Sequence, residues 1–136
     1  MNRRTVLQSI PALAFAAHGS AQPIGDAVYE LRLYTVYPDK LNAVLQRFRF
    51  HTLTLFERHG MRSVAYWTVM APVGRQPSFV YILAHASRAA AETNWKAFEA
   101  DPDWQKVRDA SEAHGELVSD IQSFFMRPTD FFPQLL

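Results

Sequence analysis

The sequence contains no cysteine, so disulfides, thiolate nucleophiles, iron–sulfur clusters and cysteine-based zinc sites are excluded. It also lacks a Gly-rich phosphate loop, a G-x-S-x-G elbow and a dinucleotide fingerprint, which disfavours nucleotide cofactors. His51 and His59 stand eight residues apart, about 12 Å along a helix, and cannot chelate one ion as an i, i+4 pair does. We therefore predict no metal and no cofactor. Convergence of His85 with His114, or a single histidine bound to haem, stays open as an alternative.

A strong charge of either sign is also missing. The 14 Lys and Arg residues face 13 Asp and Glu, and removing Arg3 and Arg4 leaves 12 against 13, a net charge of −1. No basic surface of the kind that attracts nucleic acid is expected.

Long hydrophobic runs are absent too. The apolar stretch from Ile10 to Ala17 is far shorter than the roughly 20 residues that a membrane-spanning helix needs. It follows the pair Arg3-Arg4 and precedes small residues at 19–21, a pattern typical of a twin-arginine export signal. We predict a signal peptide over residues 1–21 and a periplasmic or secreted protein of residues 22–136, with no transmembrane segment after signal removal. A membrane anchor or a disordered tail is the alternative.

Aromatic and apolar residues are plentiful, at 13% and 49% of the chain. The 115 residues after Ala21 suffice for one domain with a packed core. Residues 29–36 alternate with period two, which is typical of a strand. Similar reasoning assigns the rest of the chain: a long helix over 39–59, strands over 61–69 and 79–85 joined by a loop at 71–77, a helix capped by Ser87, a helical segment from Asp101 to Gly115, a strand over 117–127 and an irregular tail.

This order of elements predicts an α+β fold, the ferredoxin-like βαββαβ arrangement in which both helices cover one face of a four-stranded antiparallel sheet. Residues 79–84 are apolar at every position and residues 124–126 at adjacent positions, so these strands need cover on both faces. One chain supplies cover for one face only. A second copy stacked sheet to sheet would supply the other, so we expect a homodimer.

Several short motifs resemble the NIPSNAP family across nearly all of residues 22–136. They are Tyr29-Glu-Leu-Arg32 with Tyr34, His51-Thr-Leu, Leu55-Phe56-Glu-Arg-His59-Gly60, Tyr66-Trp67, Trp95 with Phe98, Asp101-Pro-Asp-Trp104 and Arg127-Pro-Thr-Asp130-Phe131. The resemblance implies a dimeric α+β barrel but no established reaction. Related barrel families include cofactor-independent monooxygenases, haem-handling proteins and small-molecule isomerases. Thr54 departs from the family's His-Thr-Leu-Pro pattern, and the export signal departs from the mitochondrial association of the animal members.

His51 is the first candidate for chemistry, because it lies at the edge of the predicted helix's apolar face, where a partly desolvated imidazole can transfer protons near neutral pH. A structural hydrogen bond is the alternative for His51, and His59 is expected to be structural, in the last helical turn. Arg32 shares a strand face with Glu30 and Tyr34, and under cover it must pair with Glu30, with a partner's carboxylate or with an anionic ligand.

Tyr66 and Trp67 are adjacent on a strand and must point to opposite faces of the sheet. We name His51, Tyr66 and Arg32 as catalytic candidates, and as ligand-binding candidates Tyr34, Trp67, Trp95, Tyr81 and Phe48.

These residues favour a small apolar or aromatic ligand held between sheet and helices. Catalysis would be cofactor-independent oxygenation or isomerisation, with His51 as proton acceptor and Tyr66 or Arg32 stabilising an enolate-like anion. The alternatives are a non-enzymatic protein-interaction module and a haem- or tetrapyrrole-binding protein.

Overall fold

The computed structural model describes residues 27–70 and 75–132 of the chain. The predicted signal peptide at 1–21, the first four residues of the predicted loop at 71–77 and the last residues of the tail lie outside these ranges. None of the helices that the structure describes is long and apolar enough to cross a membrane.

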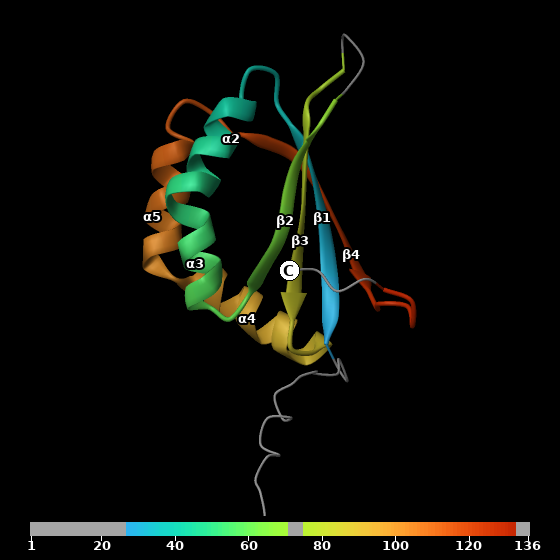
Figure 1. The fold of residues 1–136 in the computed structure, drawn as a ribbon. Helices are drawn as coiled ribbons and strands as arrows, with labels where there is room; N and C mark the ends of the chain where they lie inside the picture. Colours follow the sequence, from blue (N-terminus) through green and yellow to red (C-terminus); the bar gives the residue numbers. More distant parts are fainter. Residues whose placement is uncertain (1–26, 71–74, 133–136) are drawn as a thin grey trace, which may run out of the picture.

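The fold is the predicted α+β arrangement, in which helices cover one face of a four-stranded antiparallel sheet (Figure 1). The strand order is β2-β3-β1-β4, so the first and third strands are central and the second and fourth are edges. The elements are β1 (Val28–Val36), α2 (Leu41–Arg47), η1 (Phe48–Thr52), α3 (Leu53–Arg58), β2 (Arg62–Val69), β3 (Ser78–His85), α4 (Arg88–Ala100), α5 (Pro102–Ser111) and β4 (Val118–Met126).

The long helix predicted over 39–59 is present over residues 41–58, but it is not a regular α-helix throughout. It begins at Leu41, because Asp39 has a positive φ of 67° that no helix accommodates. Its middle turn, η1, is a π-helix with the wider i→i+5 hydrogen-bond spacing, flanked by α2 and α3. Apolar spacing alone gave no sign of this turn, since the same helical face stays buried through it.

The two predicted caps are confirmed. The Ser87 side chain accepts a hydrogen bond of 2.9 Å from the Ala90 amide, and Asp101 accepts one of 2.8 Å from the Asp103 amide with Pro102 at the first helical position. The predicted end of the second segment at Gly115 was wrong, because α5 ends at Ser111 and a turn carries the chain to Gly115, where φ is 117°.

The two faces of the sheet differ in burial. Toward the helices, β3 places Phe79, Tyr81 and Leu83 in a buried core that also includes Phe48 and Phe56. The opposite face carries apolar side chains that this chain leaves partly exposed, among them Leu31, Leu33, Val80, Ile82, Trp67 and Phe124, the last two at 49% and 51%. Near one end of this face Phe132 packs on Tyr29, at 5.3 Å between ring centroids.

Candidate functional site

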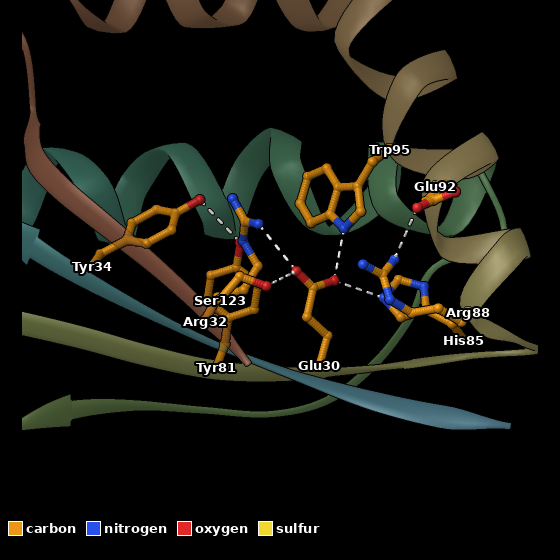
Figure 2. Close-up of polar contacts among 9 residues, drawn as sticks. All are labelled: Glu30, Arg32, Tyr34, Tyr81, His85, Arg88, Glu92, Trp95 and Ser123. Atoms are coloured by element: carbon orange, nitrogen blue, oxygen red, sulfur yellow. Dashed lines mark hydrogen bonds and ion pairs between the residues drawn. The ribbon is translucent and has the colours of Figure 1, made fainter. Parts of the chain in front are cut away.

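A buried carboxylate, Glu30, lies at the centre of the polar contacts beneath the helices (Figure 2). One carboxylate oxygen, Oε1, accepts hydrogen bonds from His85 Nε2 at 2.8 Å and from Trp95 Nε1 at 2.7 Å. The other, Oε2, accepts from Ser123 Oγ at 2.6 Å and from an Arg32 guanidinium nitrogen at 3.1 Å. Glu30 is 1% exposed, so the donors take the place of water around the charge.

Four elements converge on this carboxylate. Glu30 and Arg32 are two residues apart on the central strand β1, so both side chains point to the helix face. The neighbouring strands β3 and β4 supply His85 and Ser123, and the Ser87 cap starts α4 so that Trp95 reaches over the sheet.

The charge state of Glu30 is set by these donors. Burial by itself would raise the pKa of Glu30, but the hydrogen bonds from His85, Ser123 and Trp95 and the charge of Arg32 lower it from 4.5 to about 2. Glu30 therefore stays ionised at neutral pH and is a poor proton acceptor. Its role is to hold Arg32 and Trp95 in place.

The guanidinium of Arg32 lies between this carboxylate and a pair of tyrosines. Its Nε donates to the Tyr81 hydroxyl at 3.0 Å, and the Tyr81 and Tyr34 hydroxyls are 2.9 Å apart. The guanidinium carbon lies 4.2 Å from the Trp95 ring centroid, within cation–π range. Burial opposes the charge on Arg32, but Tyr81, Tyr34 and Glu30 raise its pKa overall. Arg32 is a cation held in place by Glu30, Tyr81 and Trp95.

A cavity of about 230 Å³ opens beside Arg32, between the sheet and the helical layer. Its lining combines six aromatic residues with six charged ones, and three of the charged residues are the arginines Arg32, Arg47 and Arg108. The other lining residues are Tyr34, Phe48, Thr52, Phe56, Trp95, Phe98, Glu99, Trp104, Glu112, Glu116, Val118 and Ile121. Aromatic rings next to polar groups that converge on one space are found in small-molecule sites, and here the charged groups are more numerous than is usual there.

Four of the residues named from the sequence line this cavity: Arg32, Tyr34, Trp95 and Phe48. Tyr81, a fifth, is fully buried and touches Arg32 from below, where burial raises its pKa.

Tyr66 and Trp67 do point to opposite faces. Tyr66 stacks on Tyr81 at 5.3 Å between centroids and bonds to Ser63 Oγ at 2.7 Å, and burial raises the pKa of Tyr66 to about 12. Trp67 lies on the sheet face away from the helices and from the cavity.

His51 is not brought together with Arg32. It is exposed in η1 and lines another hollow, of about 490 Å³, between the α2–η1 segment and α5, with Phe50 and Lys106. This hollow and the interior cavity share Arg47 in their walls. His51 is not among the residues that line the interior cavity. A catalytic role for His51 stays a prediction.

The sequence reasoning named Glu30 only as a partner for Arg32, and that pairing is confirmed. It missed Ser123 and Arg47, and it weighed His85 only as a metal ligand. His85 ends the alternating series Phe79, Tyr81, Leu83, and a polar residue at the end of a buried strand face was the available signal. Within residues 27–70 and 75–132, no three His, Asp or Glu side chains are grouped to hold a metal ion.

Comparison with known proteins agrees with this fold. The family model described as NIPSNAP matches residues 29–133. No protein with a curated description matches the sequence. Among solved structures, a NIPSNAP-like domain protein from Burkholderia xenovorans is 18% identical with a TM-score of 0.67, covering 81% of this chain and 91% of its own.

A NIPSNAP family protein from Agrobacterium tumefaciens is 21% identical with a TM-score of 0.66, covering 79% of this chain and 93% of its own. A more distant match is SnoaB, a cofactor-independent oxygenase from Streptomyces nogalater, at 17% identity and a TM-score of 0.53, covering 80% of this chain and 99% of its own. At these identities the structural matches establish a shared fold.

Proposed function

Since the chain belongs to the NIPSNAP family, we propose that it is an exported homodimer that binds a small, largely apolar or aromatic molecule in the cavity between its sheet and its helices. The observation that carries the proposal is the cavity itself, where a fixed cation, Arg32, meets a wall of aromatic rings. Arg32 is held by Glu30 and two tyrosines, so a ligand would find it already in position.

The proposed chemistry is cofactor-independent oxygenation or isomerisation. A carbonyl oxygen of the ligand would lie against Arg32, whose charge stabilises the enolate that forms when a neighbouring C–H loses its proton. The enolate then reacts with dioxygen or is protonated at another atom. The likeness to SnoaB supports this class as an analogy of fold. Glu99, Glu112 and Glu116 are the carboxylates at the cavity that can accept a proton.

The homodimer is proposed for the open face of the sheet. Its apolar side chains, which include Trp67 and Phe124 near half exposure, form a contiguous surface across all four strands. A second copy stacked on this face would remove them from water, and the cavity on the other face would remain free.

Native mass spectrometry of the exported protein tests all three parts at once. We expect a dimer of residues 22–136 that carries the added mass of a small molecule. The cavity variant Ile121→Trp, which adds bulk at the cavity wall, should lose that mass, whereas Ala97→Trp on the exposed surface of α4 should keep it. Retention of the ligand by Ile121→Trp would place it elsewhere, and a monomer would refute the dimer.

A further inference from the structure

Arg47 is a second cation at the cavity, and it takes no part in the hydrogen bonds around Glu30 and Arg32. It is the last residue of α2 and its side chain is 6% exposed. It lines the interior cavity and also borders the hollow that holds His51, so it stands between the two. The guanidinium carbon lies 5.2 Å from the Trp104 ring centroid. Trp104 lines the same cavity, so the charge stands at an aromatic wall.

The Arg47 guanidinium makes fewer hydrogen bonds than it has N–H groups to donate. One guanidinium nitrogen donates to Ser111 Oγ at 3.2 Å, and the same nitrogen is 3.8 Å from Glu112, too far for a hydrogen bond. Its Nε is buried and has no hydrogen-bond partner in the described part of the chain. Arg32, by contrast, has a carboxylate at 3.1 Å and a hydroxyl on its Nε. A buried guanidinium left in this state is costly, and a second anion would relieve it.

The charges around the cavity are arranged by depth. The Arg47 and Arg32 side chains are 6% and 16% exposed. The other charged residues of the lining lie farther out: Glu112 is 28% and Arg108 43% exposed, and Glu99 and Glu116 are exposed. Exposed carboxylates are screened by water, so the inner part of the cavity favours negative charge. Burial lowers the pKa of Arg47, but an arginine remains protonated at neutral pH.

The helix is also distorted at this place. The π-helical turn η1 starts directly after Arg47, and Phe48 and Thr52 within it line the cavity. Thr52 Oγ1 donates to the Arg47 carbonyl at 3.3 Å, which supports the wide turn from inside. Single π turns within α-helices often occur at functional sites because they redirect side chains that a regular helix would place elsewhere.

We propose that the ligand of this cavity carries a carboxylate, which pairs with Arg47 while the apolar or aromatic body of the molecule packs against the ring-lined wall toward Arg32. The inference rests on the proposed function and specifies its substrate class as aromatic or apolar carboxylic acids. Arg47 selects and orients the ligand, and Arg32 serves the reacting end.

Calorimetric titration of the full chain with 2-naphthoate and with its neutral isostere 2-naphthamide tests this. We expect the carboxylate to bind about tenfold tighter or more. Arg47→Met, which keeps the apolar stem, should bring the carboxylate down to the affinity of the amide, and Arg47→Lys should restore part of the preference. The control Arg49→Met removes an exposed arginine two residues away and should keep the full preference.

Equal binding of the two probes to the unaltered protein would overturn the carboxylate inference and leave the proposed function standing, and this comparison needs no variant. A preference that survives in Arg47→Met would also overturn it. Binding of neither probe would argue against the proposed aromatic-ligand function and the inference together.

Discussion

Two carboxylates of this protein have similar partners in different surroundings. Glu30 is bound by a histidine, an arginine, a tryptophan and a serine under the helical layer. Asp101, at the junction of α4 and α5, accepts bonds from His59 at 2.7 Å, from Arg58 at 2.9 Å and from the Asp103 amide. His59 is thus structural, as predicted, and connects the end of α3 to the next helices.

Both carboxyl groups have a pKa of about 2, for different reasons. The Asp101 pKa is lowered by the His59 hydrogen bond first and by the Asp103 amide, with little burial to oppose them. The Glu30 pKa is low although burial acts to raise it. The Asp101 side chain is 10% exposed beside the half-exposed Arg58, whereas Glu30 is 1% exposed, so water replaces a lost donor more readily at Asp101 than at Glu30. The same pKa therefore corresponds to very different contributions to stability.

The largest expected effect comes from Glu30→Gln. The substitution keeps the shape of the side chain but leaves Arg32 without its carboxylate in a buried site, so we expect a loss of about 3–5 kcal/mol in the free energy of unfolding. Urea denaturation followed by circular dichroism measures it. The matched control is Asp101→Asn, which keeps a capping side chain and should cost much less. Equal losses in the two variants would show that the two carboxylates contribute equally to stability.

A smaller effect is expected in the pH dependence of stability. The folded-state pKa of Glu30, about 2, lies below its ordinary value of 4.5, so the unfolded chain takes up the proton first as the pH falls. The stabilisation is complete above about pH 5 and is lost between about pH 5 and pH 2, a few kcal/mol in all. Unfolding curves across this range should show a shallower slope for Glu30→Gln than for the unaltered protein. Parallel slopes would mean that Glu30 has an ordinary pKa.

The smallest expected effect is that of Arg58→Ala. The Arg58 side chain is 47% exposed and contacts Asp101 at 2.9 Å and Asp103 at 2.8 Å in water, where ion pairs contribute little and salt screens them. We expect a change close to the error of thermal denaturation at 0.15 M salt and none at 1 M salt. A large loss that persists at high salt would show that the Asp101 cluster behaves like the buried one.

Much of the fold could be predicted because its signals are local. Each of these signals depends only on the residues of one short segment. They are the alternation at 29–36, the caps at Ser87 and Asp101 and the continuous apolar run at 79–84. The π turn at Phe48–Thr52 could not be predicted, because it changes the backbone without changing which residue types face the core.

The site was predictable only in part. Alternation placed Arg32 on one face with Glu30 and Tyr34, and that grouping is confirmed by the hydrogen bond to Glu30 and the buried tyrosine pair. It did not say that this polar face is the one under the helices. His51 was singled out for its place at the edge of a helical face, yet in the structure it is exposed on the outer side of the layer.

The sequence by itself determined the order of the elements, the antiparallel sheet with helices on one face, and the family, because periodicity, caps and turn residues act over a few neighbours. Only the tertiary structure decided that Trp95 and Ser123, 65 and 93 residues from Glu30, bind one carboxylate, and that Arg47 faces the cavity beside Arg32. Hydrogen bonds and charge pairing depend on distances across elements, and those distances exist only once the sheet register and the helix layer are in place.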